Sequence, residues 1–457
     1  MLKTALTLTT LLLGGCALTA QQPPAEPPPP ASFKGSAEWQ RLPAAAAVPE
    51  AWWTLFKDPV LDGLQAELVV GNQNLAASLA QTASARAVLQ ASGAALWPTL
   101  SVSGGSTRAA TANAGPATSD ALTASASWEV DLWGRLSEAV KAAGASYRAS
   151  AADLAALRLS AQATLTQNYL ALRTAEAQQA LLARTAAADQ RALDLTQARY
   201  ASGVAAQSDV LQARTQLRSV EAQLSEMRTQ RAQLEHAIAV QIGKLPGQFS
   251  LAVGAPGAAL PELPPVPALL PSTLLAQRPD IAAARERQLA AYAQIGIADA
   301  AFFPSIELSA SGGYRGASWS HLLSAPNLVW SLGAAVAAPL FDGGQRRLAS
   351  AQARAAAEAA TAAYRQAVLT AFQEVEDNLV QFAESGAALA LQRDAFEAAQ
   401  RHLDIVLAQY RAGTVSYLNV VAAQTAALSA EGQMLSARNR QLAAANVLLK
   451  SLGGRSG

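Results

Sequence analysis

The fold is decided by a stretch that occurs twice in the chain, as Trp97-Pro98-Thr99-Leu100-Ser101 and again as Phe303-Pro304-Ser305-Ile306. The two prolines are 206 positions apart, at 98 and 304. Further along, Gly203 and Gly413 each follow a Leu-Asp pair and a tyrosine, and they are 210 positions apart. Such a nearly constant interval is the mark of a tandem duplication, because copies drift in length mainly at their loops. The chain therefore holds two copies of one structural unit.

The two copies set the domain boundaries. The first copy covers residues 51–245 and the second covers residues 278–453, with residues 246–277 as a linker between them. Each copy begins with a helical pattern, which in the first copy runs from about Leu61 to Leu96 and stops before a proline that cannot extend it.

A stretch of alternating apolar and small polar residues follows in each copy, which is the pattern of a β-strand with two different faces. In the first copy, Leu122 and Trp128 alternate in this way with Thr123 and Ser127. We expect β-hairpins at about residues 99–130 and about residues 305–340, each with two strands of about ten residues joined by a long polar loop.

Long helices follow both β-hairpins. Residues 131–200 contain no proline, and a helix of that length spans roughly 105 Å at about 1.5 Å per residue. Gly203 and Gly413 are natural helix ends, so we expect helical hairpins at residues 131–245 and 342–453. The return arm of the second copy carries an apolar residue every seven positions, at Val421, Leu428, Leu435, Leu442 and Leu449. Such heptads predict supercoiled helix pairs.

The N-terminus has the features of an exported, lipid-anchored protein. A lysine at position 3 precedes an apolar stretch too short to span a membrane, which is typical of a signal peptide, here residues 1–15. The run Leu13-Gly14-Gly15-Cys16 resembles the bacterial lipobox, in which the cysteine is lipidated. We expect Cys16 to carry the lipid and residues 16–50, which are rich in proline, to form an extended tether. A conventional signal peptide is the alternative.

The composition argues against catalysis and against nucleic-acid binding. The chain has 457 residues, of which 51% are hydrophobic, and its 34 Lys and Arg residues nearly balance 33 Asp and Glu residues, so no basic face is available for phosphates. One cysteine and three histidines (His236, His321 and His402) leave little material for a metal site. Because no motif for a catalytic nucleophile or a phosphate loop occurs, we expect no enzyme activity, cofactor, metal or nucleic-acid partner.

The alternating strands have the length of membrane strands. About 9–11 residues are enough for a tilted transmembrane β-strand, although a water-soluble sheet packed on the helices has the same pattern. Four strands cannot close a barrel, and lipid does not tolerate open strand edges. If the strands span a membrane, several protomers must therefore share one barrel, and the pattern alone allows a dimer or a trimer.

Several motifs occur in the same order as in one known protein family. They are Trp52–Asp62, Trp128–Arg135, Arg278–Ile281, Ile295–Ala298, Phe303–Ser305 and Pro339–Gly344. On these motifs the chain resembles, over essentially its whole length, the TolC/OprM-like outer-membrane factors, which are the exit ducts of tripartite efflux and secretion systems.

The resemblance implies a mainly α-helical fold with a small membrane β part. It implies a homotrimer in which four strands per protomer form a twelve-stranded β-barrel in the outer membrane and the helical hairpins form a periplasmic α-barrel. It also implies a periplasmic adaptor protein and, because of the lipobox, an inner-membrane RND-type pump as partners.

The resemblance also implies a gate at the tips of the helical hairpins, Tyr200–Val210 and Tyr410–Val420. The residues that match by position are Tyr200, Gly203, Asp209, Tyr410, Gly413 and Leu418. Of these, Leu418 aligns with a hydrophobic constriction and Tyr410 with an aromatic residue that ties neighbouring helices. Relatives often have an acid where this chain has Ala422, so an acidic ring from the second copy is in doubt. Asp209 could supply carboxylates instead, or act only as a helix-start carboxylate.

The function that these observations predict is passive conduction of small molecules, such as drugs or metal ions, across the outer membrane. An outer-membrane duct for type I protein secretion is an alternative. A periplasmic lipoprotein scaffold of coiled coils is another, although it would not explain the paired amphipathic strands.

Overall fold

The computed structural model describes residues 22–25, 28, 30, 32–34, 49–111, 114–254, 260–264, 266 and 277–452. The predicted signal peptide and Cys16 lie outside these residues, as does most of the predicted tether. The chain divides into two compact units, and each takes parts of both copies. The first unit contains Ala80–Ala152 and Ala282–Ala367, and the second contains most of the other described residues.

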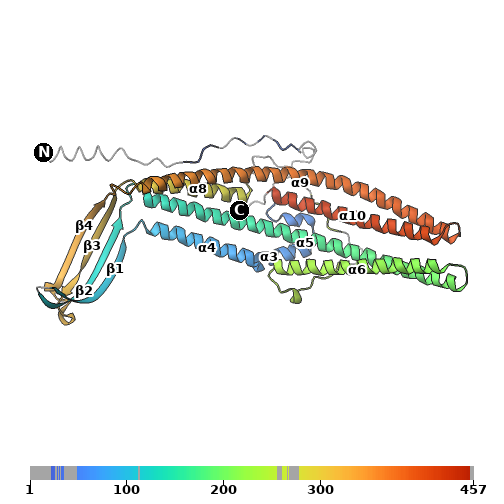
Figure 1. The fold of residues 1–457 in the computed structure, drawn as a ribbon, viewed down its shortest axis with the longest axis horizontal. Coiled ribbons are helices and arrows are strands. Elements are labelled where there is room, and N and C mark those ends of the chain that lie inside the picture. Colours follow the sequence, from blue (N-terminus) through green and yellow to red (C-terminus); the bar gives the residue numbers. More distant parts are fainter. Residues whose placement is uncertain are drawn as a thin grey trace. The chain divides into compact units, whose positions relative to one another are not determined.

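The first unit carries a four-stranded antiparallel sheet in the order β1-β2-β3-β4 (Figure 1). The strands are β1 (Thr99–Thr111), β2 (Ala114–Glu129), β3 (Ser305–Gly316) and β4 (Leu328–Ala337). The two copies join through β2 and β3, where Trp128 lies opposite Leu308. Within the described residues, β1 and β4 each have a neighbouring strand on one side only.

The first β-hairpin differs from the prediction, because its strands have 13 and 16 residues. Pairing continues through most of the expected polar loop, for example from Thr107 to Ser119 and from Ala109 to Ala117. Threonine is β-branched and favours extended backbone, so this loop sequence extends the ladder. The second β-hairpin does have a long connection, which contains the 3-10 turns η3 (Trp319–His321) and η4 (Ala325–Asn327).

The two faces of the sheet have different chemistry. The apolar face carries Leu100, Val102, Leu122, Trp128, Leu308, Trp330, Leu332 and Val336. The hydroxyl face carries Thr99, Ser101, Ser125, Ser127, Ser309, Ser311 and Ser331. Hydroxyl groups on the hydroxyl face pair across strands, at 2.9 Å between Ser101 and Ser125 and 2.9 Å between Ser311 and Ser331.

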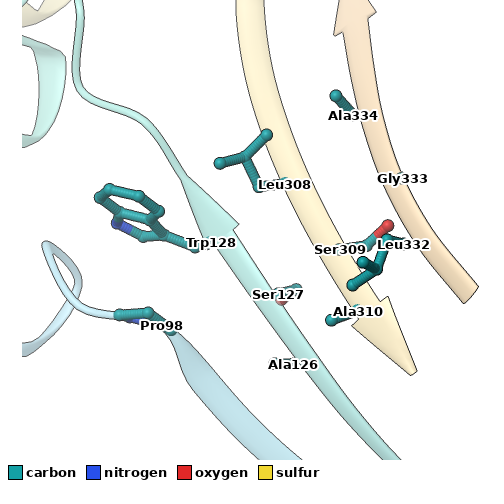
Figure 2. A pocket seen from close by; sticks show the side chains of 10 residues that line it. All are labelled: Pro98, Ala126, Ser127, Trp128, Leu308, Ser309, Ala310, Leu332, Gly333 and Ala334. Atoms are coloured by element: carbon teal, nitrogen blue, oxygen red, sulfur yellow. The ribbon is translucent and has the colours of Figure 1, made fainter. Parts of the chain in front are cut away.

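A groove of about 450 Å³ marks the apolar face. Figure 2 shows Trp128 and Leu308 on neighbouring strands at this groove, with the smaller Ala310 and Ala334 along the strands. The Trp128 indole Nε1 donates a hydrogen bond to the carbonyl of Leu96, 2.9 Å away. Large and small side chains thus alternate on an exposed surface, which leaves it apolar but uneven.

The helix predicted at the start of the first copy is in fact two helices, α3 (Pro59–Gly71) and α4 (Gln73–Ala94). The break lies at Asn72, whose backbone is extended. Its side-chain Oδ1 accepts hydrogen bonds from the backbone N–H groups of Asn74 and Leu75, each at 3.0 Å. Asn72 therefore caps the second helix, as asparagine favours, and the apolar periodicity continues across the cap.

The long helices are α5 (Arg135–Ala201), α6 (Gln207–Gln241), α8 (Pro279–Ala300), α9 (Gln345–Arg411) and α10 (Tyr417–Ser451). In the second unit α6 runs back along α5, and α10 runs back along α9 (Figure 1). Both outgoing helices have 67 residues and both return helices have 35 residues, which fits the duplication. None of the helices in the described part of the chain combines the length and apolar character needed to cross a membrane.

The main core of the second unit joins the start of the chain to both copies. Trp52 and Phe56 of the 3-10 turn η1 (Trp52–Phe56) pack in one cluster with Leu172 of α5 and Leu448 of α10. All four side chains are at most 1% exposed. Burying side chains of this size stabilises the fold by about 1.5–3 kcal/mol each, so this core holds the bases of both helical hairpins together.

Candidate functional site

The tips of the helical hairpins are two short turns, each built on a glycine. Gly203 and Gly413 both have a φ of 76°, a backbone conformation that residues with a Cβ rarely adopt. The N–H of Gly203 donates to the carbonyl of Tyr200 at 2.9 Å, and the N–H of Val204 donates to that of Arg199 at 2.9 Å. This pair of bonds ends the helix in a Schellman motif. The second copy repeats it at Gly413.

Behind the turns, the two hairpins share a small apolar core that we call the tip cluster. Its buried members are Leu193, Ala213, Leu217, Val406, Tyr417, Val420, Val421 and Ala423. They come from all four long helices of the second unit, α5, α6, α9 and α10. The tip cluster is therefore the contact that holds the first hairpin against the second near their ends.

Tyr410 lies at the edge of the tip cluster and joins the two hairpins. Its ring centroid is 5.7 Å from that of Tyr417 in α10. On the other side, the guanidinium carbon of Arg199 in α5 lies 5.1 Å from the Tyr410 ring centroid, a distance at which a cation is attracted to an aromatic face. Burial, together with Asp189 and Tyr410, raises the pKa of Tyr417 to about 12, so its hydroxyl stays neutral.

The other predicted tip residues lie on the surface. Tyr200 is 47% exposed and Leu418 is 62% exposed, and neither takes part in the tip cluster. Asp209 is half-buried in the first turn of α6, which is the position of a helix-start carboxylate. Ala422 is exposed one turn beyond Leu418 on α10, so the two residues lie on the same side of this helix.

Sequence reasoning missed three residues of this site, Asp189, Arg199 and Tyr417. For Asp189 a signal was present, because Leu182, Asp189, Leu193 and Thr196 follow one another at helical spacing and all four are buried. A charged residue in such a row marks a polar group inside the packing. The ring contacts of Arg199 and Tyr417 join different helices and left no local signal.

The described residues hold no group of three or more His, Cys, Asp or Glu side chains that could bind a metal ion. Cys16, the predicted lipidation site, lies outside the described residues. What the described chain offers is therefore a sheet with one apolar and one hydroxyl face, and two long helical hairpins that meet at their tips.

Comparison with known proteins accounts for this combination. The family model described as "Outer membrane efflux protein" matches residues 64–244 and 270–454 of the chain. The chain belongs to this family. As an outer membrane efflux protein, it is located in the outer membrane and serves as an exit duct, with its long helices forming a periplasmic tunnel.

Individual relatives of this outer membrane efflux protein match over nearly their whole length. The pyoverdine export outer membrane protein OpmQ of Pseudomonas aeruginosa is 31% identical, over 97% of this chain and 95% of the relative. Among solved structures, the outer-membrane channel OprN has a TM-score of 0.88 at 26% identity, over 95% of this chain and 99% of OprN. The open state of the Neisseria gonorrhoeae MtrE channel has a TM-score of 0.86 at 26% identity, over 96% and 98%.

Proposed function

We propose that three copies of this outer membrane efflux protein form a passive duct that conducts small molecules delivered by an inner-membrane RND-type pump and a periplasmic adaptor protein. The observation that carries the proposal is the sheet, which exposes an apolar face and a hydroxyl face and has no strand beyond β1 or β4 within the described residues. It supports a wall with lipid on one side and water on the other.

The apolar face fits the lipid side of this wall. Leu100, Val102, Trp330 and Leu332 are all more than 70% exposed, which is an unusual exposure for large apolar side chains on a protein surface in water. The open edges of β1 and β4 require partners, because lipid offers none to backbone N–H and C=O groups. Pairing β1 of one copy with β4 of the next supplies them, and three copies give a twelve-stranded barrel with the hydroxyl face inside.

The hairpin tips fit the periplasmic end of the duct, where an adaptor protein would dock. The gate assigned to this end is made by Leu418 and Asp209, one near the tip of each hairpin, and it opens when the hairpin pairs slide past one another. The solved MtrE channel is an open state, which supports a duct with more than one state. Cys16 anchors the chain to lipid through its acyl group.

The names of the relatives favour efflux of small molecules over secretion of proteins. OpmQ is named for pyoverdine export, and another relative of 31% identity, TtgF of Pseudomonas putida, is named a toluene efflux pump outer membrane protein. Neither name refers to a secreted polypeptide.

Conductance in planar lipid bilayers tests the duct and the gate together. The purified protein is expected to migrate as a trimer after chemical cross-linking and to form channels of low resting conductance. The double variant Leu418→Ala with Asp209→Ala is expected to raise that conductance several-fold, because it removes side chains from the constriction.

The matched control is Leu211→Ala, since Leu211 is a similarly exposed leucine of α6 at 55% and is not assigned to the gate. A cross-linked dimer, or a protein that forms no channels, would contradict the duct. Unchanged conductance in the double variant would contradict the assigned gate and leave the duct standing.

A further inference from the structure

Asp189 is a carboxylic acid inside the contact between the two helical hairpins. It lies on α5 and is 2% exposed, and its neighbours Ala186 and Leu193 on the same helix face both belong to the tip cluster or pack against it. Among the described residues, its Oδ2 atom is buried and has no hydrogen-bond partner. A buried carboxylate oxygen without a partner is costly, because it has lost its hydrogen bonds to water and has gained none from the protein.

The groups around Asp189 do not neutralise it. From α10 it faces the hydroxyl-bearing Tyr417, which in turn contacts Tyr410 of α9. From α6 the tip cluster presents the apolar Ala213 and Leu217. Two arginines of α5 are engaged elsewhere: Arg184 pairs with Glu431 of α10 at 2.9 Å, and Arg199 lies over Tyr410.

Burial is the cause that raises the pKa of Asp189 from 3.8 to about 6. No charged side chain of the described residues contributes to that shift. The raised pKa means that the packed tip binds a proton more tightly than a tip whose hairpins have separated and let water reach the carboxyl group.

We propose that Asp189 is a gating residue, whose ionised form weakens the packing of the first hairpin on the second and whose protonated form restores it. The inference rests on the proposed duct, because weaker packing of the first hairpin on the second is taken to favour the sliding that opens it. The ionised Asp189 side chain therefore favours opening of the duct at neutral pH, and the protonated side chain favours closure in acid.

The direction of the effect follows from proton linkage. Well below pH 3.8 the carboxyl group is protonated whether the hairpins are packed or separated, so packing has no charge penalty. As the pH rises through the window between 3.8 and about 6, the separated state releases its proton first, and packing weakens. Each unit of pKa difference is a factor of about ten, so packing is expected to weaken by about a hundredfold and then stay constant above the window.

The second copy has no acid at the position equivalent to Asp189. The interval of 210 positions that relates Gly203 to Gly413 places Ala399 of α9 at the position equivalent to Asp189. The same helical hairpin therefore forms in the second copy with an alanine at this position. Of the two hairpins, only the first has an acid at this position. Replacing Asp189 is therefore expected to leave the fold intact.

Bilayer recordings between pH 4.5 and 7.5 test the proposal. Wild-type channels are expected to gain at least tenfold in open probability across this range. Asp189→Asn and Asp189→Leu, which cannot ionise, are expected to stay near the acidic wild-type level at every pH. The matched control is Asp194→Asn, an exposed acid of the same helix that accepts a hydrogen bond from Gln190 at 2.8 Å, and it is expected to behave as the wild type.

A second readout does not depend on conduction. Hydrogen exchange of the α5 and α6 tip amides, corrected for the intrinsic pH dependence of exchange, is expected to quicken with pH in the wild type and not in Asp189→Leu. A wild type without pH dependence, or variants that keep it, would overturn the role of Asp189. If the wild type forms no channels while the exchange result holds, the duct fails and the titrating contact stands.

Discussion

At the scale of single residues, Tyr169 shows how a buried polar group is accommodated. Its side chain is fully buried in α5, and its hydroxyl donates to Asp58 Oδ2 at 2.6 Å and accepts from Arg173 Nε at 3.0 Å. Asp58 also caps α3 by accepting from the N–H of Val60 at 2.9 Å. One hydroxyl thus links the start of the first copy to its long helix, in contrast to Asp189, whose Oδ2 has no such partner.

We expect Tyr169→Phe to destabilise the second unit by about 1–3 kcal/mol, because it removes two hydrogen bonds to charged groups, one to the half-buried Asp58 and one from Arg173. The measurement is the thermal unfolding midpoint of the detergent-solubilised protein. Tyr200→Phe, at an exposed tyrosine of the same helix, serves as the control and is expected to unfold at the wild-type temperature. Equal midpoints for both variants would mean that the hydroxyl of Tyr169 contributes nothing.

Local rules predict some of these residues and not others. Gly203 and Gly413 were predictable as helix ends, because only their own backbone is involved. The role of Asn72 as a helix cap was not predictable, because the apolar periodicity continues across it. In such a pattern a capping asparagine resembles any polar residue on the exposed side of a helix. The roles of Tyr169 and Tyr417 depend on partners from distant segments, such as Asp58 and Tyr410, which no short stretch of sequence brings together.

At the scale of elements, the turn at each hairpin tip depends on its glycine. Replacing Gly413 by alanine forces a Cβ into a left-handed backbone, which costs about 1–2 kcal/mol. We expect Gly413→Ala to speed hydrogen exchange at the second tip by up to about tenfold. Gly432→Ala is the opposite control, because Gly432 lies inside α10 with nothing within 4 Å of an added Cβ. It is expected to slow exchange by stabilising the helix by about 0.5–1 kcal/mol.

The sheet depends on a glycine for a different reason. At Gly313 of β3, an added Cβ would meet the Leu122 carbonyl and lie 2.7 Å from the Thr123 Cα on β2. Both are backbone atoms that cannot move without breaking the pairing between the two copies. We expect Gly313→Ala to abolish heat-modifiable migration in detergent gels, which reports a folded membrane sheet.

The neighbouring Gly312→Ala is the control for this experiment, because an added Cβ at Gly312 meets nothing within 4 Å. It is expected to migrate as the wild type. If both variants fold equally well, the close approach of β2 and β3 at Gly313 does not limit assembly of the sheet.

The type of an element was predictable where a single sequence pattern, helical or alternating, continues over many residues. The heptads of α10 and the proline-free stretch of α5 gave helices within a few residues of the expected bounds. Strand length was not predictable in the same way, because threonine and alanine occur both in loops and in paired strands. Whether β1 continued to Thr111 was decided by its partner β2, and the partner is not a local property.

At the scale of the whole molecule, the duplication and the compact units divide the chain differently. Each unit takes segments from both copies, so each unit is built from the two copies together. The sheet needs β2 from the first copy and β3 from the second, and the tip cluster needs both hairpins. The number of protomers is still a prediction, because it depends on surfaces that face other copies.

The lipid anchor and the strands are separate means of membrane attachment. We expect Cys16→Ser to abolish incorporation of labelled palmitate while channel formation in planar bilayers is retained, because the apolar face of the sheet does not involve the N-terminus. Labelling that persists would mean that Cys16 is not the lipidated residue. Loss of channels together with the label would mean that the strands cannot insert without the anchor.

In the proposed duct, the paired hydroxyls of the sheet have a consequence for the solutes that travel past them. Ser101 with Ser125, and Ser311 with Ser331, already engage one another, so each has fewer free hydrogen-bonding positions to offer a passing solute. A wall of this kind is wetted by water but binds no solute strongly, so a solute stays only briefly at any one point. In the proposed duct, chemically dissimilar cargoes would therefore pass this wall with similar ease, so the sheet itself would not select among them.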